Sequence, residues 1–467
     1  MLSLIGYATI VVILALLLSQ RVSPVVALAG IPIVGALIAG NSPTEVAGFI
    51  AEGLGGVVGV VAMFVFAIIF FGILRDAGMF DPVVNRIVKW GARGPVAVTL
   101  ATTTLALVAH LDGSGATTFL ITIPAMLPLY ERLGMSRLVL TTCVGLSAGV
   151  MNLMPWGGPT ARAAATIEAD ANEIWVPLIP AQIVGIILVL AIAYFLGRKE
   201  TRRLQRITEG DVSAEVEEST ARVGSADGRH MNEDGISGDG SGQLQTIARQ
   251  SSSTDDTLLR PKLLWINVTL LVATLAALVA GIAPEMCFIV AAIVAVSINY
   301  PGLKAQTARF DAHAKAAMLM ASTLLAAGVL LGVLEGSGMI EAMASSAATV
   351  IPSAMAPMLP LIVGVLGVPM SLLFGPDAYY FGVLPVLVGV GGEFGVSAMN
   401  LAQASVLGQE TVGFPISPLT GSFYLLVGLA NVNIGKHILH LIGWAWLVSV
   451  VMLGVAVATG VIPLWAS

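Results

Sequence analysis

The chain has 467 residues, of which 57% are hydrophobic and 11% are charged, and its mean hydropathy is +0.91. Soluble domains carry about 25% charged residues, so the composition excludes an ordinary soluble protein. Apolar runs of about 20 residues, the length that crosses a bilayer, recur along the sequence. The pattern predicts an all-α polytopic membrane protein. The net charge of −6 is spread over aqueous loops and says little about partners.

The first half of the chain, residues 1–197, is predicted to cross the membrane five times. Its first apolar run contains no Lys or Arg, unlike the basic start of a cleaved signal peptide, so it is interpreted as a span. The predicted spans lie near 2–20, 24–40, 55–75, 137–170 and 175–197.

An apolar region at about 95–133 is interrupted by Gly and Pro. It is too short for two full crossings and too interrupted for one, so we predict a re-entrant hairpin. Such backbone exists at membrane depth only where protein or a water-filled cavity covers it.

The fourth span contains the segment NLMPWGGPTAR at 152–162. Pro155 and Pro159 each remove a backbone donor, so they predict an unwound stretch near mid-membrane. Unwinding frees carbonyls for cations and exposes the N-terminus of a half-helix, which favours anions. Thr160 is expected at this N-terminus, suited to cap it or to contact a ligand. The alternative is a purely structural kink.

Residues 198–259 differ in composition from the rest of the chain. They are polar and rich in Gly, Ser and Asp, and such a segment cannot bury a core. They are predicted to form a disordered cytoplasmic linker without chemistry.

The second half, residues 260–467, repeats the first. The segment GILRDAGMF at 72–80 matches GVLEGSGMI at 332–340, an offset of 260, and the same offset relates Pro155 to Pro415 and Thr160 to Thr420. A nearly constant offset indicates an internal duplication, which is common in transporters. The corresponding spans lie near 262–281, 284–300, 316–335, 397–432 and 437–460, with a second hairpin at about 356–390.

Each half has an odd number of spans, so the second half is predicted to be inverted. Basic residues favour the cytoplasmic side. With the linker placed there, only Arg162 of the 22 Lys and Arg residues has no cytoplasmic position. Arg75 and Glu335, which occupy equivalent positions, then fall on opposite faces. Both termini are expected outside the cell.

The two hairpin tips each carry one aspartate. AHLDGSGATTF at 109–119 contains Asp112, and LFGPDAYYF at 373–381 contains Asp377. A carboxylate at membrane depth is costly and indicates function, and oxygen ligands suit hard divalent cations. We therefore predict that both aspartates hold a metal ion. The alternative is that each aspartate only caps its own hairpin helix.

Arg162 is the one basic residue in the core, and its forked guanidinium suits a carboxylate. Pairing with Glu168 or Asp170 at the outer surface is the alternative. The predicted substrate-binding residues are Ser114, Gly115, Thr117, Asn152, Pro155, Gly157, Gly158, Thr160, Arg162, Ser417, Thr420 and Ser422. The candidates for proton coupling are Asp112, Asp377, Glu410 and His110.

Motifs of soluble enzymes do not occur in the sequence. It has no Walker loop, no HExxH segment and no supported Ser/His/Asp set. Aromatic content is 6%, and no basic patch lies outside the linker. The chain is therefore predicted to be neither an enzyme nor a nucleic-acid-binding protein.

HLDGSGATTFLITIPAMLPLYERLGM, followed by NLMPWGGPTARAA, resembles the CitMHS family of citrate–divalent metal:proton symporters in the ion transporter superfamily. FGPDAYYFGVLPVL and VGFPISPLTGSFYLLVGL resemble its second-half segments, so the resemblance covers both halves. It implies proton-driven uptake of a citrate–metal complex across the cytoplasmic membrane. It also implies kinship with dicarboxylate–sodium symporters, which are homodimers with a scaffold and a moving, elevator-type transport domain.

The tips depart from those dicarboxylate relatives, which carry Ser-Asn-Thr there. The anionic tips DGSGAT and GPDAYY would repel a free polycarboxylate but help to hold a metal already bound to citrate. The metal, of magnesium or calcium type or iron, is expected as part of the substrate, with no resident cofactor. The alternatives are a proton- or sodium-coupled symporter of gluconate or a dicarboxylate, and a channel or cation/proton antiporter.

Overall fold

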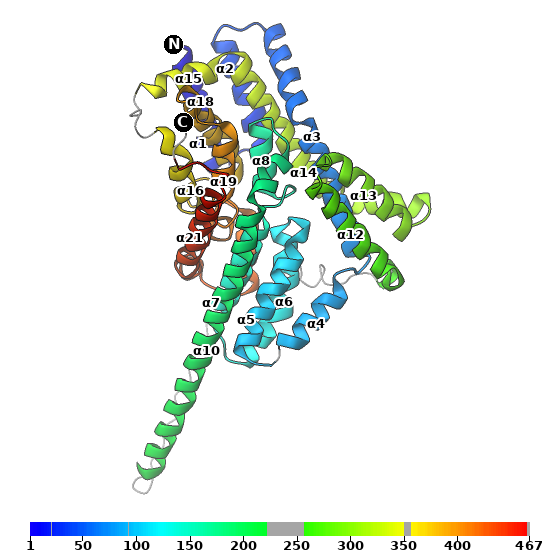
Figure 1. Ribbon diagram of the computed structural model, residues 1–467, viewed down its shortest axis with the longest axis vertical. Helices are drawn as coiled ribbons and strands as arrows, with labels where there is room; N and C mark the ends of the chain where they lie inside the picture. The colour runs from blue at the N-terminus through cyan, green and yellow to red at the C-terminus, as the bar shows by residue number, and fades with distance from the viewer. Residues whose placement is uncertain (20, 92, 222–255, 350–355, 465–467) are drawn as a thin grey trace.

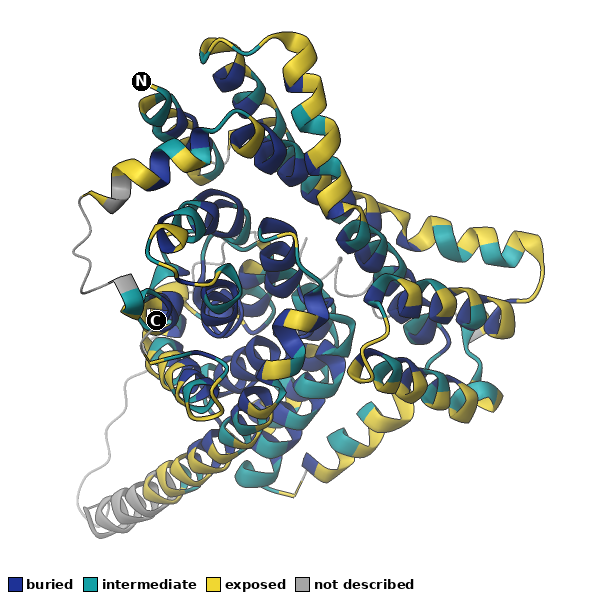
Figure 2. Cartoon of the chain, turned by 45° about the horizontal axis from the view of Figure 1, so that its top comes forward, coloured by how far each residue is buried: buried dark blue, intermediate teal, exposed yellow. Residues whose placement is uncertain are grey.

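The computed structural model describes residues 1–19, 21–91, 93–221, 256–349 and 356–464, and within these ranges the chain is helical without a β-strand. The helices form one bundle, from which the long helix α10 (Ile179–Ala221) extends beyond the rest (Figure 1). Buried residues gather where the central helices meet, and exposed faces lie on the outer helices (Figure 2). The all-α prediction is confirmed.

Seven helices of the described ranges are long and apolar enough to span a membrane. They are Leu2–Ser19, Pro43–Asp76, Pro95–Asp112, Ala171–Arg206, Pro261–Val279, Leu303–Gly336 and Ile434–Ala458. Shorter apolar helices are Val26–Ile38, Arg137–Met151, Pro284–Asn299 and Leu359–Met370. Each predicted span coincides with one of these helices or with a pair of half-helices. Pro95–Asp112 is also long enough to span a membrane, although the sequence predicted it as one arm of a hairpin.

Two helical hairpins occupy the predicted regions. In the first, α5 (Pro95–Ala109) and α6 (Gly115–Arg132) are joined by a short turn. Gly113 in this turn has φ +71°, and a Cβ there would lie 2.9 Å from the carbonyl oxygen of Trp156, so only glycine fits. The second hairpin consists of α16 (Leu359–Met370), α17 (Pro376–Ala378), a π-helical turn and α18 (Leu384–Glu393).

Two spans are interrupted, as the prolines predicted. One consists of α7 (Arg137–Met151) and α8 (Gly158–Thr166), the other of α19 (Ala398–Val406) and α20 (Gly421–Leu429). The two breaks meet, because Asn152 Nδ2 donates to the Glu410 carbonyl at 2.9 Å and Gly149 lies against the backbone of Val412. Backbone from both halves thus converges on one place in the bundle.

Helices α3 (Pro43–Asp76) and α14 (Leu303–Gly336), each of 34 residues, pack antiparallel. Gly53 faces the backbone of Gly332 near one end of α3, and Gly72 faces the ring of His313 near the other. These two contacts are related by the offset of 260, because residue 53 corresponds to His313 and residue 72 to Gly332. The crossing of α3 and α14 therefore contains the same contact twice, with the roles of the two halves exchanged. The orientation of the halves in a membrane stays a prediction.

One sequence prediction needs correction. Helix α10 continues to Ala221, so the expectation of disorder from residue 198 is wrong for 198–221. Continuing a formed helix avoids the cost of nucleation. An ion pair between Arg203 and Glu200 at 2.8 Å also supports this turn. Residues 222–255 of the predicted linker lie outside the described residues.

Candidate functional site

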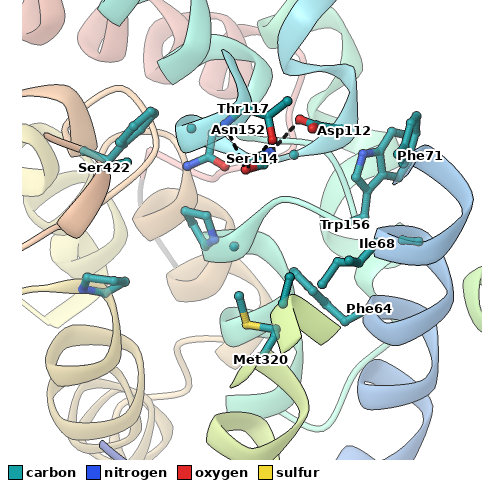
Figure 3. A pocket seen from close by; sticks show the side chains of 18 of the residues that line it. Phe64, Ile68, Phe71, Asp112, Ser114, Thr117, Asn152, Trp156, Met320 and Ser422 are labelled. Carbon is teal, nitrogen blue, oxygen red and sulfur yellow. Dashed lines mark hydrogen bonds between the residues drawn. The ribbon is translucent and has the colours of Figure 1, made fainter. Parts of the chain in front are cut away.

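A cavity of about 360 Å³ lies between the tip of the first hairpin, the two helix breaks, and helices α3 and α14 (Figure 3). Its volume is in the range of small-molecule sites. One wall is apolar and contains Phe64, Ile68, Phe71, Trp156 and Met320. The polar lining consists of Arg75, Asp112, Ser114, Thr117, Asn152, Arg162, His313, Glu410, Thr420 and Ser422.

The tip of the first hairpin is ordered by its own side chains (Figure 3). Asp112 Oδ1 accepts from the Ser114 amide at 2.8 Å. Ser114 Oγ accepts from the Thr117 amide at 3.3 Å and from the Thr117 hydroxyl at 3.1 Å. The tip thereby directs the N-terminus of α6, the positive end of its dipole, at the cavity. Asp112 caps its own turn and also lines the cavity, so capping and a role toward substrate are compatible.

Arg162 is buried on the half-helix α8. Its Nε donates to Asp377 Oδ1 at 2.7 Å, and its Nη1 donates to the Gly158 carbonyl at 3.0 Å. The alternative pairing of Arg162 with Glu168 or Asp170 is therefore wrong. The true partner lies on the second hairpin, more than 200 residues away in the chain, which local sequence does not reveal.

Asp377 lines a neighbouring cavity of about 310 Å³ rather than the one beside Asp112. Pro376 and Thr420 line both cavities and so form the partition between them. The two tip aspartates therefore do not face one cavity. A metal role for either aspartate stays a prediction.

Glu410 lies in the second break and is 1% exposed. Its Oε2 accepts from the Thr420 hydroxyl at 2.8 Å, whereas Oε1 has no hydrogen-bond partner among the described residues. Its φ of +54° is a left-handed conformation that costs a non-glycine residue about 1–3 kcal/mol. A buried carboxylate oxygen without a partner is also costly. Glu410 is thus a strained acid, held at the cavity and able to take a proton or a cation.

Several predicted site residues lie elsewhere. Thr160 is fully buried inside α8 and donates to the Leu153 carbonyl at 2.8 Å. The expectation that it caps the half-helix is wrong, because Gly157 occupies the N-cap. Pro155 and Ser417 lie in the breaks without lining the cavity. His110 is buried against Thr118, 2.7 Å away, and its ring stacks on Phe414.

The remaining predicted residues come together at the cavity, although their binding roles stay predictions. They are Asp112, Ser114, Gly115, Thr117, Asn152, Gly158, Arg162, Glu410, Thr420 and Ser422.

Sequence reasoning missed Arg75, which it assigned to the cytoplasmic surface. Arg75 lies in the last turn of α3, lines the cavity and donates from Nη1 to Thr117 Oγ1 at 3.2 Å. The repeated segment GILRDAGMF contains it and was the available signal. Trp156 was also missed, although it lies within NLMPWGGPTAR; its Nε1 donates to the Leu111 carbonyl at 2.8 Å.

A family model described as citrate transporter, CitMHS, matches residues 4–408. The chain belongs to the citrate transporter family. This confirms the resemblance and makes the chain a multi-pass membrane transporter, not an enzyme.

Two proteins of Bacillus subtilis (strain 168) are similar to this chain over their full length. A protein named citrate transporter is 39% identical over 463 residues, with 99% of this chain and 100% of the relative covered. A Mg(2+)/citrate complex secondary transporter is 35% identical over 465 residues, with the same coverage. The structure of the Alcanivorax borkumensis YdaH transporter is similar with a TM-score of 0.50 at 16% identity. It covers 90% of this chain and 87% of the other, and supports the fold alone.

Proposed function

We propose that this member of the citrate transporter family carries citrate as a complex with a divalent metal ion, in symport with protons, across the cytoplasmic membrane. One observation carries the proposal: a single cavity combines anion-binding groups with two carboxylates, Asp112 and Glu410. Free citrate would be repelled by both acids. A metal–citrate complex offers carboxylates to the arginines and a cation to the acids.

The metal is cargo in this account, not a resident cofactor. The relative whose name specifies a Mg(2+)/citrate complex supports the same substrate here and makes Mg²⁺ the first metal to test. Mg²⁺ binds through one or two carboxylates and retains several waters, which suits a cavity with few acids.

Each part of the cavity has a role in the proposal. Arg162 and the N-termini of α8 and α20 bind carboxylates. Asp112 faces the metal from the first tip. Glu410 carries the proton, because one of its oxygens is unpartnered and it is almost fully buried. Asp377 positions Arg162 through their ion pair.

Alternating access follows in this proposal from movement of the hairpins and half-helices against the α3–α14 pair. The exchanged contacts along that pair support two inverted halves, which gives two related conformations. A homodimer is expected from the family resemblance.

The test is labelled-citrate uptake into proteoliposomes under an inward proton gradient, with Mg²⁺, Ca²⁺ or Fe²⁺ in turn, with chelator, and with protonophore. The proposal expects uptake that needs a metal and collapses with the protonophore. Equal uptake with chelator would overturn the metal–citrate substrate in favour of a free organic anion. Metal flux that ignores citrate would indicate a cation transporter instead.

A further inference from the structure

Arg75 is a cavity-lining arginine whose charge has no ion-pair partner. It is half-buried, and no carboxylate in the described part of the chain lies within ion-pair distance of it, although Asp76 and Asp112 interact with its charge from further away. Its only hydrogen bond given by the structure goes to the neutral Thr117 hydroxyl, at 3.2 Å. A guanidinium has five N–H donors, so most of the capacity of Arg75 is unused.

The other arginine that lines the cavity and an arginine of α14 are both paired. Arg162 binds Asp377 at 2.7 Å, and Arg309 binds Asp76, the neighbour of Arg75, at 2.9 Å. Asp76 also accepts from His313 at 2.9 Å, so its carboxylate is already engaged. Asp76, the acid nearest in sequence to Arg75, therefore pairs with residues of α14 instead, and Arg75 faces the cavity.

The surroundings of Arg75 supply the rest of an anion site. The N-terminus of the 18-residue helix α6 points at the same part of the cavity. Ser114 and Thr117 line the cavity there, and Gly115 lets the helix end pack closely on Phe414, whose ring would lie 3.0 Å from a Cβ at this position. A carboxylate at this place would meet a charged fork, the hydroxyls of Ser114 and Thr117, and the N-terminal turn of α6 with its helix dipole, each of which favours an anion.

We propose that Arg75 is a second carboxylate-binding arginine of the substrate site and acts with Ser114 and Thr117. This rests on the proposed function and refines it. Arg75 comes from α3, whereas Arg162 comes from α8, so two carboxylates of one polycarboxylate are held from different walls. Asp112, beside the first carboxylate, then faces the metal. The arrangement favours an anion that has further carboxylates besides those that chelate the metal.

The test uses the purified full-length protein in nanodiscs, titrated calorimetrically with Mg²⁺–citrate. R75Q should weaken binding about 10- to 150-fold, the range for a lost hydrogen bond to a charged group. R75K keeps the charge without the fork and should weaken it less. R86Q, which removes an exposed arginine of α4 (Asp81–Gly91), is the matched control and should bind as the wild type does.

A second ligand separates a binding role from a structural one. Citramalate has a methyl group where citrate has one carboxymethyl arm. The wild type and R86Q should prefer citrate, and R75Q should lose most of that preference while its ligand-free melting temperature stays unchanged. If R75Q does not fold, R75K provides the test. Wild-type affinity for Mg²⁺–citrate and wild-type preference for citrate over citramalate in a folded R75K would overturn the proposal. Wild-type affinity in R75Q would also overturn it.

The wild-type titration separates this inference from the proposed function. If the wild type binds metal-free citrate in preference to the complex, the proposed function fails. The same comparison of R75Q with R86Q on free citrate then still decides the role of Arg75. If the wild type binds no polycarboxylate, both fail.

Discussion

The two hairpin tips each carry one aspartate, yet their surroundings differ. At the first tip, Asp112 accepts from the Ser114 amide at 2.8 Å and lines the cavity beside the hydroxyls of Ser114 and Thr117. At the second, Asp377 is locked to Arg162 at 2.7 Å and faces a separate cavity. The two acids are 265 residues apart rather than 260, so they do not occupy equivalent positions of the repeat, and each tip uses its acid differently.

The residues that pack behind the two tips also differ. The second tip is anchored by buried tyrosines: Tyr380 donates to the Gln409 carbonyl at 2.8 Å, and Tyr379 bonds with Ser405 at 2.9 Å. The first tip instead ends in Gly113, Ser114 and Gly115, and it is held by Trp156, whose Nε1 donates to the Leu111 carbonyl at 2.8 Å, while Ser114 lines the cavity. The comparison teaches that the first tip is built to receive a ligand and the second to hold an arginine in place.

The largest effect is expected at the Arg162–Asp377 pair. D377N leaves a buried guanidinium without its ion-pair partner. Breaking a fully buried pair costs about 3–5 kcal/mol, which is an upper bound here because the Asp377 side chain is 19% exposed. Thermal unfolding in detergent should show a large drop in melting temperature for D377N and for R162Q. The double variant should recover most of it, because no lone charge remains. Equal and additive losses in the double variant would contradict a coupled pair.

Glu410, between the two tips, is expected to show the next largest effect. E410Q removes the proposed proton carrier, so citrate accumulation driven by a proton gradient should fall about a hundredfold, equivalent to about 2.7 kcal/mol. Citrate–citrate exchange at equal pH should persist, since it needs no net proton movement. E393Q, an exposed glutamate at the end of α18, is the control. Gradient-driven uptake that survives in E410Q assigns the proton elsewhere.

Asp112 gives a smaller effect of a different kind. D112N should raise the Mg²⁺ concentration for half-maximal citrate uptake about tenfold, equivalent to about 1.4 kcal/mol, because one anionic group facing the metal is lost. D81N, at an exposed position of α4, should leave it unchanged. Metal titrations of uptake measure this directly. An unchanged metal requirement in D112N would show that the first tip does not sense the cation.

Ser114 is expected to give the smallest effect on stability. S114A removes the N-cap of α6, which costs about 1 kcal/mol, and also removes one hydroxyl from the proposed carboxylate site. A modest drop in melting temperature together with weaker citrate binding is therefore expected. T269A, an exposed hydroxyl on α12 (Leu264–Val279), serves as the control in both measurements.

Much of the fold could be predicted from the sequence, because a segment that crosses lipid must make its backbone hydrogen bonds internally, as a helix does. Apolar run lengths located the spans, and Pro155 and Pro415 located the breaks. The long continuation of α10 was missed because a polar composition indicates only that a segment cannot form a core. It does not exclude the extension of a helix that has already formed.

The candidate site was readable in part. Residues within one motif, such as Ser114 and Thr117, could be grouped from spacing alone. The pairing of Arg162 with Asp377 depends on how the two halves pack, so local spacing suggested nearer acids. Arg75 was missed for a related reason: its place near a helix end suggests solvent, while the approach of the first hairpin puts it on the cavity.

A structure of the protein with bound Mg²⁺–citrate would test the division of labour between the tips most directly. The account predicts ligand density at the first tip, with carboxylates near Arg75, Ser114 and Thr117, and an intact Arg162–Asp377 pair. Density beside Asp377 in the second cavity, with the first cavity free of ligand, would contradict it.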